Sequence, residues 1–236
     1  MSVQLPFFTF EGQETLEDYG IYLTSKPNLP SPEENMQAIE VSGRSGSLTM
    51  KDGSYKDIEV TVGIRFRYTG ESTQDRFTLI HNWLSGSGDL VFSEFDSFIL
   101  RVKHVRPLKW DYNPTILQYS TEVTFICYPF KFGGRITYNL TKPQYIFNDG
   151  TRESYPVIKV FGKGDISLSI NNQTVVLKGV EDYITIDSNQ MNTYKDTKPQ
   201  NNKMYSPFPV LEVGRNYISW TGNVSKVVFD NQSQFK

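Results

Sequence analysis

Residues 58–68 read Ile58-Glu59-Val60-Thr61-Val62-Gly63-Ile64-Arg65-Phe66-Arg67-Tyr68, with apolar side chains at every second position. A period of two sustained over this length is typical of a β-strand with one buried and one polar face. We therefore expect a long strand here, with Arg65 and Arg67 on its polar face. Asp52-Gly53, a pair typical of tight turns, comes just before it and predicts a hairpin turn.

The same alternation continues along the first half of the chain. A second long strand is expected at residues 117–127, and residues 89–95 and 98–105 are expected to form a hairpin between the two long strands. Aromatic residues make up 14% of the chain, and such side chains suit pleated, half-buried surfaces. The predicted fold class is therefore mainly β.

One segment has the pattern of a helix. Ser72-Thr73-Gln74-Asp75 resembles a capping box, with Asp75 in place of the more usual glutamate. Phe77, Ile80 and Leu84 then recur at helical spacing, and Gly86 is a natural C-terminal stop. We expect a helix of about three turns that packs one face on a sheet.

The alternation breaks at Tyr128-Pro129-Phe130-Lys131-Phe132-Gly133-Gly134, because proline cannot donate to a strand ladder and the two glycines end it. We place a domain boundary here, between residues 1–135 and 136–236. The second domain is expected to be a small β-sandwich, with a surface loop at residues 189–206. Its expected short strands are residues 156–161, 166–170, 174–177, 183–186, 216–220 and 226–229.

The bulk composition argues against several functions. The formal net charge is −2, without a basic or acidic tail, so no nucleic-acid-binding surface is expected. No apolar run approaches the roughly 20 residues of a membrane helix, and the first residues do not resemble a signal peptide. We therefore expect no membrane insertion. Cys127 is the only cysteine, so no intrachain disulfide can form.

The Gly162-Lys163-Gly164 stretch could open a phosphate-binding loop, but such a loop leads into a helix. Residues 165–170 alternate as a strand instead, and we interpret the glycines as a hairpin turn. The two histidines, His81 and His104, have no second ligand at metal spacing. Cys127 falls on the apolar face of its strand and is expected to be buried.

Carboxylates and exposed aromatics leave alternatives open. Asp182 and Asp187 are separated by a predicted strand, which favours turn-flanking aspartates over a catalytic pair. Several aromatics of the second domain could stack on a sugar, with Tyr217 and Trp220 as the candidates. A role in the core or at an interface is favoured for the same residues. No catalytic residue, cofactor or metal is expected.

Ordered motifs in the first half resemble the distal tail proteins of long-tailed phages of Gram-positive bacteria. They comprise Phe10-Glu11-Gly12, Tyr19-Gly20-Ile21, Val41-Ser42-Gly43-Arg44-Ser45-Gly46-Ser47-Leu48, Asp52-Gly53-Ser54-Tyr55, Gly88-Asp89-Leu90-Val91-Phe92 and Phe125-Ile126-Cys127-Tyr128-Pro129-Phe130. The second half agrees independently. Its motifs are Asn148-Asp149-Gly150-Thr151, Tyr155-Pro156-Val157-Ile158, Tyr183-Ile184-Thr185-Ile186-Asp187-Ser188 and Pro209-Val210-Leu211-Glu212-Val213-Gly214-Arg215-Asn216. The resemblance covers nearly the whole chain.

This resemblance implies a structural protein of the virion, made in the host cytoplasm and placed at the tail tip. It implies a homo-hexameric ring of N-terminal domains, each a barrel-like β-sandwich with one helix and a projecting hairpin. The C-terminal domain would be a galectin-like β-sandwich. Implied partners are the tail tube protein, the tail-associated fibre or hub protein and receptor-binding proteins.

An alternative function and the placement of two arginines remain open beside this interpretation. The chain could be a carbohydrate-binding module that attaches the particle to the host cell wall. Arg65 and Arg67 could lie at a subunit interface, line the lumen of the ring, or simply be solvated.

Overall fold

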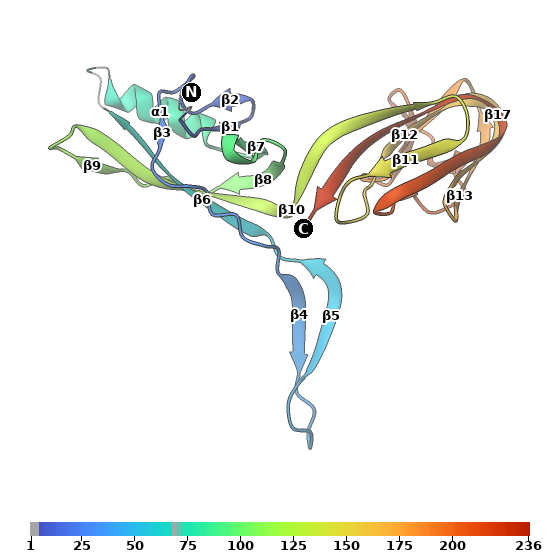
Figure 1. The fold of residues 1–236 in the computed structure, drawn as a ribbon, viewed down its shortest axis with the longest axis horizontal. Helices are drawn as coiled ribbons and strands as arrows, with labels where there is room; N and C mark the ends of the chain where they lie inside the picture. The colour runs from blue at the N-terminus through green and yellow to red at the C-terminus, as the bar shows by residue number, and fades with distance from the viewer. Residues whose placement is uncertain (1–4, 68–69, 71) are drawn as a thin grey trace. The chain divides into compact units, whose positions relative to one another are not determined.

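In the computed structural model, residues 5–67, 70 and 72–236 are described. Strands dominate, and α1 (Thr73–Trp83) is the single α-helix among these residues, so the mainly-β prediction is confirmed (Figure 1). The chain divides into two compact units, residues 1–131 with Lys236, and Phe132–Phe235.

The first unit contains one large antiparallel sheet and a separate two-stranded hairpin. The strands of the unit are β1 (Phe8–Phe10), β2 (Gln13–Glu14), β3 (Tyr22–Leu23), β4 (Glu34–Ile39), β5 (Leu48–Tyr55), β6 (Ile58–Arg67), β7 (Gly88–Phe92), β8 (Ile99–Val105), β9 (Asp111–Asn113) and the first part of β10 (Gln118–Leu140). β6 pairs with β10 from Ile58–Cys127 to Arg67–Gln118. The sheet runs from β3 through β6, β10, β8 and β7 to β1 and β2, and β9 pairs with β10. β6 lies where the first long strand is predicted, although Tyr68 falls outside the described residues. The second predicted strand is the first part of β10, which is longer than expected. The β7–β8 hairpin is also present, but residues 93–95 form a short 3₁₀ helix in place of the predicted end of the strand.

This sheet curls around an apolar core. β1 and β10 are separated in the sheet by β7 and β8, which would hold their backbones about 14 Å apart in a flat sheet. The ring of Phe8 on β1 nevertheless lies 5.5 Å from that of Phe125 on β10, centroid to centroid. The inward side chains of β6, among them Val60 and Ile64, close the same core.

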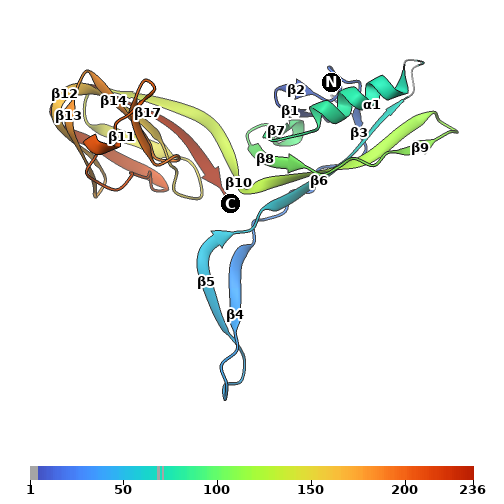
Figure 2. The same cartoon turned by 180° about the vertical axis from the view of Figure 1, so that it is seen from behind.

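The helix forms as the sequence predicts. Ser72 is its N-cap and accepts a hydrogen bond from the backbone N–H of Asp75. Ile80 and Trp83 are buried, and Gly86 takes a φ of +85° just after the helix. α1 therefore packs one face on the sheet, as the views from the two sides show (Figures 1 and 2).

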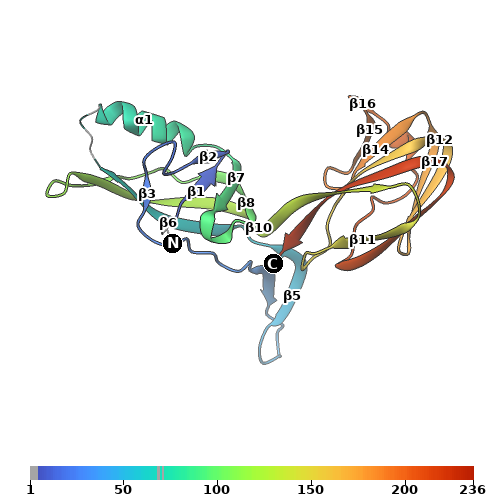
Figure 3. The same cartoon turned by 45° about the horizontal axis from the view of Figure 1, so that its top comes forward.

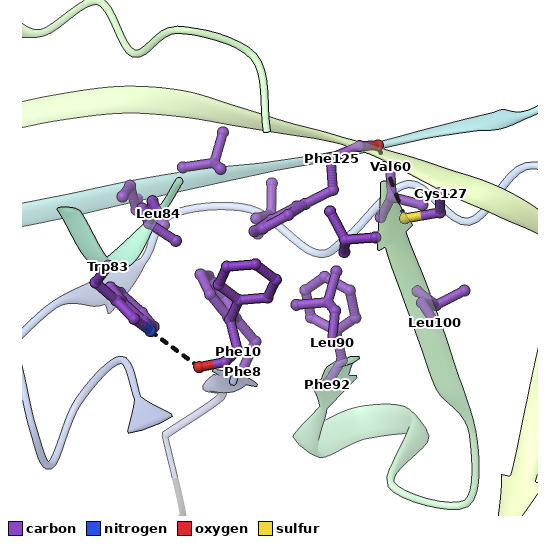
Figure 4. Packing of buried hydrophobic residues seen from close by; sticks show 14 of the residues in the cluster. Phe8, Phe10, Val60, Trp83, Leu84, Leu90, Phe92, Leu100, Phe125 and Cys127 are labelled. Carbon is purple, nitrogen blue, oxygen red and sulfur yellow. Dashed lines mark hydrogen bonds between the residues drawn. The ribbon is translucent and has the colours of Figure 1, made fainter. Parts of the chain in front are cut away.

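Trp83 fixes the helix to the N-terminal strand. Its ring stacks between those of Phe8, at 5.7 Å, and Tyr19, at 4.1 Å. The indole N–H donates a 2.9 Å hydrogen bond to the carbonyl oxygen of Phe10 (Figure 4). One side chain therefore closes the core and satisfies a buried backbone acceptor.

A separate two-stranded hairpin, β4–β5, extends away from the other strands of the first unit (Figure 1). The prediction of a hairpin turn at Asp52-Gly53 is wrong. Both residues lie inside β5, where the pairing slips between Glu34–Tyr55 and Met36–Lys51. Gly53 has a φ of +77°, and the Asp52 carboxylate accepts from Ser54, so the pair forms an irregularity in the strand.

The second unit is a two-layered β-structure. Its strands are the last part of β10, β11 (Gln144–Asn148), β12 (Val157–Ile170), β13 (Gln173–Val180), β14 (Tyr183–Asp187), β15 (Asn192–Lys195), β16 (Lys198–Pro199) and β17 (Gly214–Phe235). The start of β12 pairs with β14, and its end pairs with β13. β17 follows β12 through both regions, next to β11 at one end and β10 at the other (Figure 3).

β12 and β17, the two long strands of the second unit, both bend at glycines. The predicted hairpin turn at Gly162-Lys163-Gly164 is therefore wrong. The stretch lies within β12, and the pairing with β17 shifts register between Lys163 and Ser167. A Cβ on Gly162 would lie 2.4 Å from the Asn223 carbonyl oxygen of β17, and one on Gly222 would lie 2.5 Å from that of Asp165. The glycines allow two backbones to approach at a corner where both strands pass from one layer to the other.

A single core fills the space between the two layers. One layer contributes Ile158, Val160, Ile184, Ile186, Val227 and Phe229, and the other Ile146, Ile166, Leu168, Ile170, Val175, Leu177 and Ile218. β17 is one continuous strand, although residues 216–220 and 226–229 were predicted as two separate strands.

Two further predictions need correction. β10 runs without interruption through Pro129 and Gly133-Gly134. Its pairing with β6 ends at Cys127, so the missing N–H of Pro129 breaks no bond of that ladder. Residues 189–206 are not a plain loop, because they contain β15, β16 and the short 3₁₀ helix Asn201–Lys203.

The Trp83 anchor leads to a test. Replacing Trp83 by Phe keeps an aromatic ring but leaves the Phe10 carbonyl oxygen without its donor. We expect a loss of about 1–3 kcal/mol in the free energy of unfolding, measured by urea denaturation with circular dichroism at 222 nm, to which α1 contributes. Leu79→Ala, at an exposed site on the same helix, should change stability by less than about 0.5 kcal/mol. A Trp83→Phe protein as stable as the parent would contradict this role.

The strand bend leads to a second test. Gly222→Ala places a Cβ against the Asp165 carbonyl oxygen at a φ of +98°, and we expect it to cost at least about 2 kcal/mol. Gly134→Ala is the matched control, because a Cβ there meets nothing within 4 Å. Equal thermal unfolding temperatures for the two variants would show that the bend does not need glycine.

Candidate functional site

The nucleophile and metal candidates are scattered. Cys127 is fully buried in the first core, and burial raises the pKa of its thiol to about 12, so it is protonated at neutral pH. His81 lies on α1 and accepts a 3.1 Å hydrogen bond from the Trp110 indole, whereas His104 is exposed on β8. No metal-binding group of three His, Cys, Asp or Glu side chains occurs among the described residues.

The two aspartates beside β14 have local structural contacts. Asp187 is nearly buried at the end of the strand and accepts from the backbone N–H of Gln190. Asp182 has a φ of +72° just before the strand, where the chain turns. Tyr183, between them in sequence, donates to Asp196, and this hydrogen bond raises the pKa of Tyr183.

Arg65 and Arg67 lie on the outward face of β6, as predicted. Arg65 donates a 3.0 Å hydrogen bond to Gln118 on β10, and its guanidinium is 5.9 Å from the centre of the Tyr22 ring. Arg67 is exposed. Together with Phe66, these residues line a cavity of about 260 Å³. Arg65 is therefore partly held by neighbouring side chains, whereas the charged group of Arg67 is exposed to solvent.

The β4–β5 hairpin exposes a row of apolar side chains. Ile39 pairs with Leu48 and Gln37 with Met50, so Ile39, Leu48 and Met50 share one face. All three are exposed. We call this the hairpin face. Gly43 and Gly46, both with positive φ between the two strands, are the sequence signal that could have located this hairpin, but they do not reveal which residues share a face.

The structure does not bring Tyr217 and Trp220 together. Ile218 and Trp220 pair with Ile170 and Leu168 on β12 and share their inward face, so Trp220 packs on the second core. Tyr217 points outward, and its ring lies 5.0 Å from that of Tyr145 on β11. Phe147 and Arg215 lie on the same face. These neighbours were not predicted, although residues 144–148 alternate as a strand with aromatic side chains on one face.

The outward aromatics and the hairpin face are two surfaces of the described residues whose exposure core packing does not explain. Exposed apolar surfaces of this kind are typical of surfaces that recognise other molecules. Among the described residues, no helix is long and apolar enough to cross a membrane.

Comparison with solved structures finds a likeness over nearly the whole chain. The crystal structure of SPP1 Dit (gp 19.1) protein, described as a paradigm of the hub adsorption apparatus in phages that infect Gram-positive bacteria, matches with a TM-score of 0.79. The likeness covers 97% of this chain and 99% of that one, at 15% sequence identity. No family model and no curated protein sequence matches. The resemblance to distal tail proteins that the motifs indicate is thereby confirmed at the level of the fold.

Proposed function

We propose that this chain is a structural distal tail protein of a phage tail. The observation that carries the proposal is the likeness of fold to the SPP1 protein, which extends over both units and not over one domain alone. No reaction is assigned to it, because its buried thiol and separated histidines are poor starting points for catalysis.

The assembly is a homo-hexameric ring at the tip of the tail, formed by the first units. The hairpin face supports an assembly of copies. A lone two-stranded hairpin is at best marginally stable in water, and β4 and β5 pair only with each other among the described strands. A neighbouring subunit that covers Ile39, Leu48 and Met50 would remove their apolar surface from water and stabilise the hairpin.

In the virion, this ring joins the tail tube protein to the tail-associated fibre or hub protein and anchors receptor-binding proteins. The second unit, proposed to be galectin-like, faces outward. This arrangement follows from the family resemblance, and the SPP1 protein's description as part of a hub adsorption apparatus supports it.

The ring is tested by mass. Light scattering and native mass spectrometry of the purified chain should give six times its 27.1 kDa, and negative-stain electron microscopy should show rings. Leu48→Lys with Met50→Lys should shift the mass toward the monomer, because both charges would be buried at the contact. Met191→Lys, at an exposed methionine of the second unit, should leave it unchanged. A chain that stays monomeric at its highest soluble concentration would contradict the proposal.

A second experiment tests whether Arg65 and Arg67 lie at the subunit interface. If Arg67 and Arg65 lie at the subunit interface, Arg65→Glu with Arg67→Glu should lower the hexamer fraction seen by light scattering, because the charge reversal opposes the contact. Lys163→Glu with Lys178→Glu, at two exposed lysines of the second unit, makes the same change in net charge and is the control. An unchanged hexamer would exclude the interface role and leave a lumen-facing or solvated pair.

A further inference from the structure

One face of the second unit exposes three aromatic rings. Tyr145, Phe147 and Tyr217 are 53%, 46% and 43% exposed. They lie together because Tyr145 pairs with Tyr217 and Phe147 with Arg215 across β11 and β17, which run side by side in Figure 3. We call Tyr145, Phe147 and Tyr217 the aromatic row. Exposed rings gathered on one strand pair mark a binding surface, because core packing does not need them there.

A cation lies within this row. The Arg215 guanidinium is 4.2 Å from the centre of the Tyr145 ring. Arg215 is exposed and makes no ion pair within the described part of the chain. Stacking on Tyr145 restricts the guanidinium plane, so its remaining N–H donors are presented toward solvent in a limited range of directions. The row therefore offers a preoriented site for an anionic group.

Short hydroxyl side chains continue the same face beyond the row. Ser219 pairs with Ser169, Thr221 with Ser167, and Ser169 with Thr174, in register across β17, β12 and β13. Within the described residues, none of these five hydroxyls has a protein hydrogen-bond partner. Because the residues between them point into the core, the five hydroxyls form a flat shelf beside taller rings.

This combination fits a saccharide better than a protein segment. A pyranose ring has a C–H face that packs on an aromatic ring, and hydroxyls at its rim that exchange hydrogen bonds with serine and threonine. An apolar helix or strand would need aliphatic side chains beneath it, and the shelf offers only Val176, opposite Ser167. Arg215 adds a bidentate donor for a carboxylate or a phosphate.

We propose that the aromatic row, Arg215 and the hydroxyl shelf bind an extended polysaccharide chain that carries anionic groups. Sugar rings stack on Tyr145 and Tyr217, their hydroxyls bond to the shelf, and an acidic substituent pairs with Arg215. This binding activity belongs to the second unit and does not depend on ring formation.

The test uses the full chain on an array of bacterial surface polysaccharides that includes phosphate-bearing, uronate-bearing and neutral polymers. We expect binding to an acidic polymer. Comparison of the phosphate-bearing with the uronate-bearing polymers shows whether Arg215 binds a phosphate or a carboxylate. Tyr145→Ala and Tyr217→Ala should each weaken binding by about three- to tenfold. Arg215→Gln should remove the preference for acidic over neutral polymers and flatten the salt dependence of binding.

Tyr183→Ala is the matched control. Tyr183 is a tyrosine of the same unit that also carries a cation, Lys159, 3.9 Å from its ring centre, but it lies on β14 in the other layer, away from the row and the shelf. Its replacement should leave binding unchanged. The unfolding temperature of each variant shows that the fold is intact.

Absence of binding to every polymer would overturn the proposal, as would binding that the row and Arg215 variants leave unchanged. A fall in hexamer mass caused by Tyr145→Ala would instead make the row a contact between copies, and this outcome also overturns it. A monomeric chain that still binds the polymer through the row would contradict the ring and leave the saccharide site in place.

Discussion

The second unit depends on two strands that bend together without losing their pairing. At the bend, Gly162 in β12 lies against the backbone of Asn223 in β17, and Gly222 in β17 lies against the backbone of Asp165 in β12. Buried backbone N–H and C=O groups must stay hydrogen-bonded, so a strand that changes layer keeps its neighbour through the corner. Any side chain at Gly162 or Gly222 would enter the opposite backbone. The bend brings both layers onto one core and sets the outward faces of β11, β12, β13 and β17 side by side.

In the first unit, a curled sheet and the side chain of Trp83 together enclose the core. The sheet curls until β1 faces β10 across the core, which leaves an open side. Trp83 closes that side, because its ring fills the space between Phe8 and Tyr19 while its N–H satisfies the Phe10 carbonyl oxygen. The helix is therefore part of the core, and its few buried residues are enough to fix it.

Because both cores are already packed, the apolar side chains that stay exposed indicate where other molecules could bind. The hairpin face belongs to a two-stranded sheet that the rest of its unit does not cover, and an assembly of copies would cover it. The aromatic row differs in chemistry, because it joins rings, a guanidinium and short hydroxyls. One surface suits a large dry contact between subunits, whereas the other suits a hydrated, polar chain.

The sequence by itself determined the elements whose signal is local. The alternation from Ile58 to Arg67 specified a strand and its buried face, Ser72 and Asp75 specified the start of the helix, and the inward position of Cys127 followed from its strand. Each depends on periodicity or capping within a few residues. The ordered motifs also indicated the fold that the SPP1 structure confirms.

Only the tertiary structure decided what distant strands do to each other. Gly162-Lys163-Gly164 and Asp52-Gly53 consist of residue types typical of turns, but both stretches lie inside strands. The first is a bend in β12 against the close backbone of β17, and the second lies at a register shift between β4 and β5. Tyr217 and Trp220 looked alike as candidates, yet pairing with Tyr145 left one outside and pairing with Leu168 placed the other inside. The physical reason is that the neighbouring strand decides both matters. It decides whether a glycine forms a turn or a bend within a strand, and whether an aromatic side chain points into the core or outward. In this fold, that strand comes from tens of residues away.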